Sequence, residues 1–196
     1  MSIALIPARS GSRRIPRKNV KVFEGKPIIA YSIETALATG LFERVVVSTD
    51  SAEIADIAES FGACSYFRPP FYCNDHVGTQ EVVAEYLRHY ADDTFGDTVC
   101  CIYATAPLMS SGDLILGHDI LIRDNRDFVF SVGYPPLQDA GQFYWGWFKN
   151  FAGRYPLIGS RTGMVHVHKA RVCDINTPED WELAVKKYRA LEDSRS

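Results

Sequence analysis

The chain has 196 residues and a formal net charge of −3, and its contents of 46% hydrophobic and 23% charged residues are ordinary for a globular protein. This length is typical of one domain, and the acidic balance excludes a general nucleic-acid-binding protein, whose surface would be basic over a whole face. The sequence contains no apolar run of the roughly 18 residues that span a bilayer and no secretory signal, so we expect a cytoplasmic protein without nucleic-acid or membrane partners.

Strands and helices are predicted to alternate at short range over residues 1–132. The strands are expected at Ile3–Ile6, Val45–Val47, residues 64–67, Val99–Tyr103 and Phe128–Val132. The helices are expected at Pro27–Ala38, residues 52–61, Thr79–Tyr90, and from a cap at Ser111 or Asp113 to about Arg123. Because parallel strands need such crossovers, the pattern predicts an α/β fold with helices on both faces of a sheet.

The last part of the chain departs from this alternation. Residues 142–148 are dense in aromatic side chains and are expected to form a strand outside the pattern. Such a run is more typical of a core or an oligomer interface than of a substrate platform, although Gln142 can still face a polar ligand. A final helix is predicted after a Thr177 cap, with Pro178 at its first position and Asp180 completing a capping box.

The cysteines and histidines offer little support for a metal centre. The cysteines are five in number and show no CxxC spacing: Cys64, Cys73, Cys100, Cys101 and Cys173. An odd count without a framework indicates reduced, buried thiols rather than disulfides or a zinc site. His166 and His168 alternate as on a strand, and ordinary surface or core positions are the commoner interpretation of such a pair than ligation.

The distribution of charge near the N-terminus is the most informative feature. Glu24 is the first acidic residue, and it is preceded by a set of cations: Arg9, Arg13, Arg14, Arg17, Lys18 and Lys21. These follow a buried strand and surround Ser10-Gly11-Ser12, whose backbone N–H groups can approach phosphate oxygens closely. Neither GxxxxGK[ST] nor GxGxxG occurs, which disfavours P-loop and dinucleotide sites. An anion-binding loop is therefore favoured over the alternative of a solvated basic loop.

Other polar clusters also follow predicted strands. They are Ser48-Thr49-Asp50, the segment from Arg68 to Asp75, and Thr105–Leu108, and Asp174-Ile175-Asn176 precedes the last helix. Ligands of open α/β sheets bind beyond the carboxyl ends of the strands, so we expect these clusters to share one site. Asp174 and Asn176 can supply hard oxygens to Mg²⁺, or Asp174 can simply cap the helix start.

These residues support a family resemblance that covers nearly the whole chain. The segment Ile6–Asn19 (IPARSGSRRIPRKN) closely resembles the N-terminal signature of the CMP-sialic acid synthetase group of cytidylyltransferases. Four further segments are in register with it: Gly25–Ile33, Val46–Asp50, Arg68-Pro69 and Asp174–Trp181. Residues 139–145 (DAGQFYW) resemble the branch that activates pseudaminic acid.

The resemblance implies a three-layer, Rossmann-like nucleotidyltransferase fold, formed by residues 1–196 as one cytidylyltransferase domain. It implies transfer of CMP from CTP to a nonulosonic acid, with Mg²⁺ as cofactor and a homodimer as the assembly. The implied nucleotide-binding residues are Arg9, Ser10, Gly11, Ser12, Arg13, Lys18, Asn19, Arg68 and Thr105. The implied catalytic residues are Arg13 and Asp174, the metal ligands are Asp174 and Asn176, and the sugar-binding residues are Gln142 and Tyr144.

The chain departs from the family pattern at three places. Gly is usual where this chain has Ser10, and Asp is usual where it has Asn176, so the charge of the metal site is weaker here. Relatives also carry a few dozen residues, including dimer-forming elements, between the positions of Pro136 and Leu137. Either the protein lacks this segment or the 196-residue sequence omits it, and the intact motifs on both sides favour omission.

The expected reaction is attack by the 2-hydroxyl of the sugar acid on the α-phosphorus of CTP. Pseudaminic acid is the favoured acceptor, with sialic, legionaminic or eight-carbon ulosonic acids as alternatives. A non-catalytic nucleotide-binding protein is an alternative of another class, because Asn176 weakens the metal site. An interaction-only scaffold gives no reason for an acid-free cationic loop behind a buried strand.

Overall fold

The structure is a computed structural model that describes residues 2–74, 76–90, 98–134 and 137–194. The strands are β1 (Ser2–Ala8), β2 (Val22–Phe23), β3 (Lys26–Pro27), β4 (Phe42–Thr49), β5 (Cys64–Phe67), β6 (Thr98–Ile102), β7 (Phe128–Tyr134), β8 (Gln138–Trp147) and β9 (Thr162–His168). The α-helices are α1 (Ile28–Leu37), α2 (Ala52–Ser60), α3 (Thr79–Tyr90), α4 (Ser111–Arg123), α5 (Phe148–Ala152) and α6 (Pro178–Asp193), and short 3-10 turns lie at Lys18–Val20, Pro70–Tyr72 and Lys169–Arg171.

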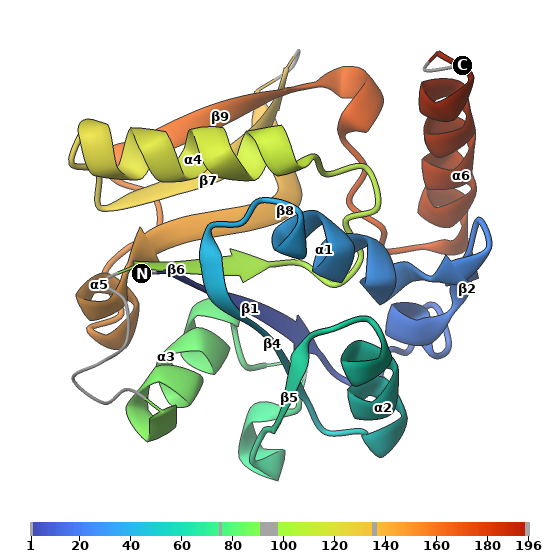
Figure 1. The fold of residues 1–196 in the computed structure, drawn as a ribbon, viewed down its shortest axis with the longest axis horizontal. Helices are drawn as coiled ribbons and strands as arrows, with labels where there is room; N and C mark the ends of the chain where they lie inside the picture. Colours follow the sequence, from blue (N-terminus) through green and yellow to red (C-terminus); the bar gives the residue numbers. More distant parts are fainter. Residues whose placement is uncertain (1, 75, 91–97, 135–136, 195–196) are drawn as a thin grey trace.

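A seven-stranded sheet forms the middle of the molecule, in the order β5-β4-β1-β6-β8-β7-β9 (Figure 1). Pairing is parallel from β5 through β6, and β7 is parallel to β9. Among the described strands of this sheet only β8 runs the other way, pairing antiparallel with both β6 and β7. The predicted α/β fold with a mostly parallel sheet is therefore confirmed.

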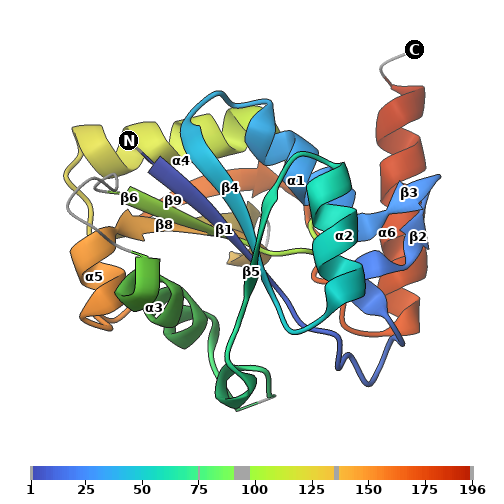
Figure 2. The same cartoon turned by 60° about the horizontal axis from the view of Figure 1, so that its bottom comes forward.

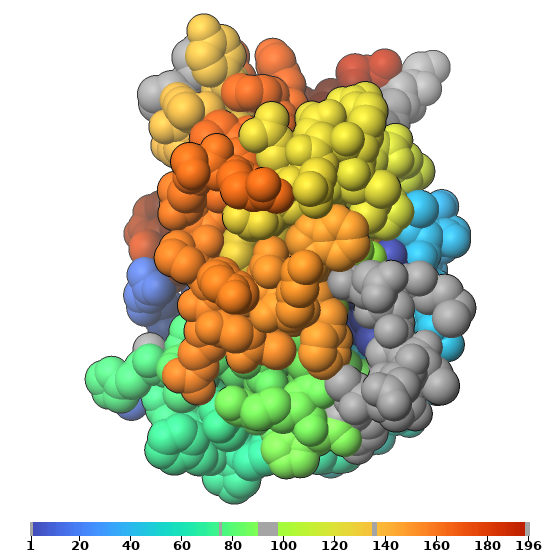
Figure 3. All heavy atoms as spheres, turned by 90° about the vertical axis from the view of Figure 1, so that its left-hand side faces the viewer, coloured from blue at the N-terminus to red at the C-terminus, as the bar shows by residue number. Residues whose placement is uncertain are grey.

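Helices cover both faces of the sheet. One core lies between the sheet and α1, α2 and α4, and includes Ile6, Ile33, Ile54 and Leu121. The other lies beneath α3 and α5 and includes Leu5, Val83 and Phe151. Figures 1 and 2 show α3 on the opposite side of the sheet from α1 and α4. At the end of the molecule seen in Figure 3, α5 and the residues after it lie between α4 and α3.

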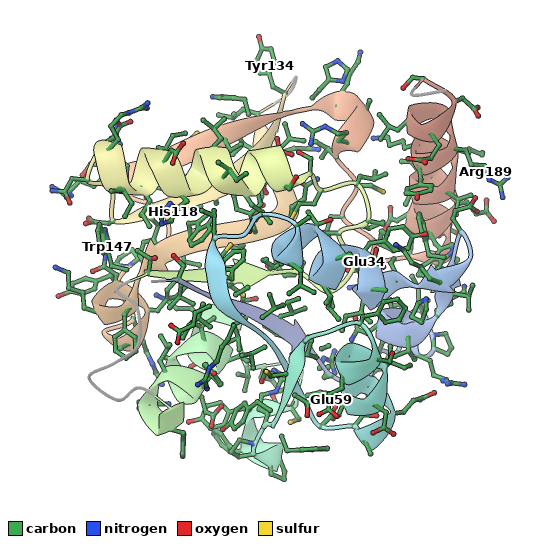
Figure 4. All side chains as sticks on the ribbon, in the orientation of Figure 1. Glu34, Glu59, His118, Tyr134, Trp147 and Arg189 are labelled. Atoms are coloured by element: carbon green, nitrogen blue, oxygen red, sulfur yellow. The ribbon has the colours of Figure 1, made fainter. Side chains whose placement is uncertain are left out.

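The C-terminal helix α6 packs on a third, smaller apolar cluster. Trp181 of α6 meets Phe23 of β2 edge to face, with ring centroids 5.5 Å apart, and Ile15 of the cationic loop belongs to the same cluster. Arg189 donates two hydrogen bonds of 3.0 Å to Glu24, in the turn between β2 and β3 (Figure 4 labels Arg189 on α6). The cluster thereby fixes the start of α6 beside the loop that follows β1.

Most predicted elements occur close to their expected bounds. The strand expected at residues 142–148 begins earlier, at Gln138, and ends at Trp147, and two further details were wrong. Helix α4 is capped by Ser110, whose side chain accepts from the Asp113 N–H, rather than by Ser111 or Asp113. Strand β4 begins at Phe42, three residues before the expected run. Phe42 stacks on Trp145, and the Glu43 and Arg44 side chains that follow it are exposed although the strand pairs with β1. Sequence patterning detects burial, so it misses strand residues that are paired but exposed.

The aromatic run forms a central strand. Phe143 and Trp145 of β8 are fully buried, and Trp145 donates to the carbonyl of Leu114 in α4. The interpretation of this run as core is supported. Strand β7 pairs directly with β8, with Gly133 opposite Gln138. The junction between Pro136 and Leu137, where relatives carry extra residues, adjoins residues 135–136, which lie outside the described residues.

The cysteines are free thiols, and their burial agrees in part with the expectation from the sequence. All five cysteines are free, and Cys100 and Cys101 are buried as expected, whereas Cys64 is exposed. Burial raises the pKa of the Cys101 thiol to about 12, so this side chain is an inert core group. Within the described residues no helix is both long and apolar enough to cross a bilayer.

Candidate active site

A cavity of about 530 Å³ opens at the carboxyl ends of the parallel strands. Strands β1, β5 and β6 end at Ala8, Phe67 and Ile102, and the loops that follow them supply most of its lining. The described lining residues are Pro7, Arg9, Ser12, Arg13, Arg14, Lys18, Asn19, Arg68, Tyr72, Asn74, Val77, Thr79, Val82, Tyr103, Ala104, Thr105 and Asn176. Residues from the first loop, from the segment after Arg68, from Thr105 and from Asn176 therefore meet at one place, as expected for an open α/β sheet. The expected cluster Ser48-Thr49-Asp50 is not among the described lining residues.

The cationic loop forms one wall of this cavity. Arg9, Arg13, Arg14 and Lys18 all line it, and the loop is held by its own contacts. Asn19 is buried and donates from Nδ2 to the carbonyl oxygen of Arg9 at 2.9 Å, which joins the two ends of the loop. Guanidinium groups gathered in this way create a site of positive potential suited to a polyphosphate.

Ser10 and Gly11 are not among the lining residues of the cavity, whereas Arg9 and Ser12 on either side of them are. Ser10 donates its N–H to Asp50 Oδ1 at 2.7 Å and its hydroxyl to Asp50 Oδ2 at 3.0 Å. The Gly11 carbonyl accepts from Arg9 Nη1 at 3.0 Å, and the Ser12 N–H donates to the Ser10 carbonyl at 2.9 Å. The N–H groups of Ser10 and Ser12 are thus engaged within the protein, and side-chain cations form the cavity side of the loop.

Arg68, which follows β5, also lines the cavity and is nearly fully buried, with 6% of its surface exposed. Its Nε and Nη2 atoms have no hydrogen-bond partner among the described residues. A buried guanidinium costs free energy unless it is paired. Because Arg68 lines the cavity, an anionic ligand there would supply the missing acceptors.

The segment before α6 closes the cavity on a third side. Asn176 donates from Nδ2 to Asp174 Oδ2 at 2.6 Å and accepts at Oδ1 from Arg14 Nη2 at 3.0 Å. Lys18 donates from Nζ to the Ile175 carbonyl at 2.7 Å. Burial lowers the pKa of Lys18, and the nearby Asp174 carboxylate opposes that effect. Asn176 lines the cavity, while Asp174 stands next to it as an exposed carboxylate.

The two residues expected to bind the sugar stand behind the cavity wall. Gln142 is buried, its side-chain Nε2 donates to the Arg171 carbonyl at 2.6 Å, and its backbone carbonyl accepts from the Tyr103 N–H at 2.9 Å. The Tyr144 hydroxyl donates to Asp139, and its ring meets Tyr103 with centroids 6.0 Å apart. Tyr103 is the residue of this group that lines the cavity.

Gly141 brings strand β8 against the Asp174 segment. Its φ of 63° lies in the left-handed region, and a Cβ built on it would approach Asp174 Cβ to 3.2 Å. Its N–H donates to Asp139 Oδ1 at 2.8 Å. A glycine is needed here because both the backbone conformation and the close approach exclude a side chain.

Comparisons with known proteins agree with this geometry. A sequence model of the cytidylyltransferase family matches residues 3–116. This chain belongs to the cytidylyltransferase family. It is 32% identical to a pseudaminic acid cytidylyltransferase of Campylobacter jejuni, with 98% of each chain covered. That alignment spans 228 positions against 196 residues, so at least 32 positions of it have no counterpart in this cytidylyltransferase.

Solved structures show the same fold at low sequence identity. A CMP:2-keto-3-deoxy-manno-octonic acid synthetase in complex with CTP superimposes with a TM-score of 0.75 at 17% identity, over 100% of this chain and 99% of the other. A Mycobacterium tuberculosis protein in complex with manganese gives a TM-score of 0.66 at 10% identity, over 94% and 97% of the two chains. The fold of this cytidylyltransferase is therefore that of CMP-sugar synthetases and related nucleotidyltransferases.

Sequence reasoning did not name several residues that the cavity brings together. Tyr103, Val77, Thr79 and Val82 line it but were not expected there, while Arg14, Tyr72 and Asn74 lie in expected clusters but were given no binding role. Their signal was position, because Tyr103 directly follows β6 and Asn74 lies in the loop after β5. His166 and His168 are exposed on β9, and no group of three or more potential metal-binding His, Cys, Asp or Glu residues occurs in the described parts of the chain.

Proposed function

We propose that this cytidylyltransferase transfers CMP from CTP to the 2-hydroxyl of pseudaminic acid, giving CMP-pseudaminic acid and pyrophosphate. The observation that carries the nucleotide part is the convergence on one cavity of the loop cations with buried Arg68, whose Nε and Nη2 atoms lack partners among the described residues. The likeness to the Campylobacter jejuni enzyme, over almost the full length of both chains, supports the acceptor.

The residues of the cavity can lower the barrier by compensating charge. The triphosphate and the sugar carboxylate are both anions, so their approach is opposed by electrostatic repulsion. Arg9, Arg13 and Arg68 would bind the triphosphate and stabilise the charge that develops on the leaving pyrophosphate. The loop is tied down before the substrate arrives, so little reorganisation is needed at the moment of reaction.

The acceptor would enter beside Tyr103 and Thr105, on the wall away from the cationic loop. Gln142 and Tyr144 would act from behind this wall, since the Tyr103 N–H is bonded to Gln142 and the Tyr103 ring meets Tyr144. Desolvation raises the pKa of Tyr144, so its phenol stays protonated and can keep donating to Asp139. The polar wall is therefore fixed in one arrangement suited to a hydroxyl-rich ligand.

We propose Mg²⁺ as the cofactor, held by Asp174 and Asn176. The donor set fits this ion, because Mg²⁺ is commonly bound through one or two protein oxygens together with substrate phosphates and water. Asp174 supplies an exposed carboxylate, and Asn176 orients it through a 2.6 Å hydrogen bond. When bound, the ion would supply Lewis-acid charge that offsets the negative charge of the phosphates.

We further propose a cytoplasmic homodimer formed from one-domain subunits of residues 1–196. Tyr134 and Leu137 flank the connection between β7 and β8 and are 61% and 57% exposed (Figure 4 labels Tyr134 at the outer end of β7). Large apolar side chains that face solvent next to one another are typical of association surfaces. Light scattering of the purified protein would show a mass near twice that of one chain, and a single-chain mass would refute the dimer.

The test of function is product identification with a panel of acceptors. The protein is incubated with CTP, Mg²⁺ and, in separate reactions, pseudaminic, legionaminic, N-acetylneuraminic and an eight-carbon ulosonic acid. We expect pyrophosphate release and a CMP-sugar mass with pseudaminic acid. If a CMP-sugar formed only with another of these acids, that acid would be the acceptor and the proposed type of reaction would stand. Binding of CTP without release in any reaction would favour a non-catalytic nucleotide-binding protein, for which the missing second carboxylate at Asn176 would be the reason.

A further inference from the structure

Asp50 makes a paired contact with the cationic loop that the proposed reaction does not use. Both carboxylate oxygens accept from one residue, Ser10, at 2.7 Å from its N–H and 3.0 Å from its hydroxyl. We infer that Asp50 is a positioning residue, which holds the first turn of the loop so that its cations face the cavity. The inference rests on the proposed binding of a triphosphate in that cavity.

The Asp50 carboxylate projects from a rigid corner of the fold. Ala8 and Thr49 are partners in the parallel register of β1 and β4, so the residues that follow them emerge side by side. The Thr49 carbonyl accepts from the Arg68 N–H at 2.8 Å, and the Thr49 hydroxyl accepts from the Ser51 N–H at 3.2 Å. Ser51 in turn caps α2, its side chain accepting from the Ile54 N–H. Asp50 is therefore fixed by two strands and a helix.

The contact determines which way the loop faces. Ser10 directs both of its donors toward Asp50 on the α2 side, and it lines a small pocket there with Arg17 and Glu53. Ser12 lines the large cavity, and Arg9, between the two spaces, lines both the large cavity and the small pocket. If Ser10 turned over, the adjacent guanidinium group would move with the backbone, because side chains are carried by the peptide planes that flank them.

The charge of Asp50 makes a purely electrostatic role a poor explanation. A carboxylate beside an anion site weakens the attraction for phosphate, so a counter-charge alone would reduce affinity for CTP. Asp50 and Ser10 are also exposed, so their contact adds little to the stability of the fold. What remains is geometry, and a misplacement of about 1 Å in a catalytic group can lower the rate by roughly 100-fold.

The test compares Asp50→Ala, Asp50→Asn and Ser10→Ala, with Asp56→Ala as a control that removes an exposed carboxylate elsewhere on α2. Asparagine can accept from the Ser10 N–H and donate to its hydroxyl, so it keeps the geometry without the charge. For Asp50→Ala we expect kcat to fall and the KM for CTP to rise, lowering kcat/KM on the order of 10- to 100-fold. Asp50→Asn and Asp56→Ala should stay close to the parent enzyme, and Ser10→Ala should be intermediate.

Limited trypsin digestion without nucleotide gives a readout that does not depend on catalysis. Cleavage after Arg13, Arg14 or Lys18 should be several-fold faster in Asp50→Ala than in the parent or in Asp50→Asn. Unchanged cleavage and unchanged kcat/KM in Asp50→Ala would overturn the inference. Equal loss in Asp50→Asn and Asp50→Ala would also overturn it, in favour of a role for the charge. A parent enzyme that fails to bind CTP would refute the proposed function, while faster cleavage of Asp50→Ala would still support the tether.

Discussion

At the scale of single residues, the site depends on which cations are already satisfied by the protein and which are not. Arg14 donates to Asn176, and Arg17 pairs with Glu53 on the exposed side of the loop. Arg68 is buried with two guanidinium nitrogens that lack partners among the described residues. These basic residues therefore differ in their contacts. Arg14 and Arg17 are bonded to other side chains of the protein, whereas two nitrogens of Arg68 can accept a ligand as partner.

Substituting Arg13 tests the stabilisation of charge during the reaction. Arg13→Ala should lower kcat by roughly 10²–10³, the usual loss when one preorganised charge-stabilising donor is removed. The measurement is the rate of pyrophosphate release at saturating CTP and sugar acid. Lys21→Ala is a matched control, because Lys21 belongs to the same cationic segment but lies over the Trp181 ring, 4.5 Å from its centroid. A rate for Arg13→Ala equal to that of the control would remove Arg13 from the mechanism.

Substituting Asn176 tests the metal site. Asn176→Asp places a second carboxylate beside Asp174, so the site should bind a divalent cation more tightly. We expect the half-saturating Mg²⁺ concentration to fall about tenfold, equivalent to about 1.4 kcal/mol. Mg²⁺ titration of activity, and of intrinsic fluorescence without substrates, would measure the change. Weaker binding of Mg²⁺ in this variant would show that Asn176 serves to hold Arg14 instead.

At the scale of elements, helix α6 positions the segment Asp174–Asn176, for which we propose metal binding, through its N-terminal cap. The Thr177 side chain accepts from the Asp180 N–H, and Asp180 accepts from the N–H groups of Asn176 and Thr177 at 2.9 and 2.8 Å. This capping box was predicted from the sequence and is confirmed. Because Asn176 is one of the bonded residues, the cap and the site share a backbone segment.

Breaking this cap should affect both stability and pH dependence. Thr177→Ala should lower the free energy of unfolding by about 1 kcal/mol. The hydrogen bonds from Asn176 and Thr177 lower the pKa of Asp180. A carboxyl with a lowered folded pKa stabilises the fold above its unfolded pKa, and the contribution is lost as pH falls through the folded pKa. Asp180→Asn should therefore flatten the acid side of the stability profile, below about pH 4.

Denaturant unfolding at a series of pH values measures both effects of the cap. Glu179→Gln is the control, since Glu179 is an adjacent, exposed carboxylate at the same end of α6. If Glu179→Gln flattened the profile as much as Asp180→Asn, the effect would come from the helix dipole rather than from the cap.

The position of strand β8 within the sheet could not be predicted from the pattern of residues along the chain. Its aromatic composition indicated a strand outside the alternation, yet its place between β6 and β7 is a matter of pairing. The antiparallel direction brings the beginning of β8, with Asp139 and Gly141, to the same edge as the carboxyl ends of the parallel strands. A strand of the opposite sense thus places its first residues beside the candidate site, behind Tyr103 and next to Asp174.

At the scale of the whole molecule, binding of a nucleotide should raise the free energy of unfolding. The cavity is bounded by segments as distant as Arg9 and Asn176, so a nucleotide that binds there links parts that would separate on unfolding. CTP at 100 times its Kd should stabilise the native state by about 2.7 kcal/mol, raising Tm by roughly 5–10 °C. Thermal melts with CTP, and with ATP as a control, would measure this. An equal shift with ATP would indicate a triphosphate site without base selection.

The sequence by itself determined the alternation of strands and helices, the cap of α6 and the cationic character of the loop from Arg9 to Lys18. These are local properties, set by periodicity, by side-chain capping chemistry and by the order of charges along the chain. The family likeness added the cytidylyltransferase activity, because its motifs extend along nearly the whole chain.

Only the tertiary structure decided how these parts face one another. It turned Ser10 toward Asp50, left two guanidinium nitrogens of buried Arg68 without partners among the described residues, and set Tyr103 in front of Gln142 and Tyr144. Such outcomes depend on contacts between residues tens of positions apart, on the register of neighbouring strands and on the direction of β8. No local pattern encodes them, because the free energy of each contact is determined by groups that meet only after the sheet has formed.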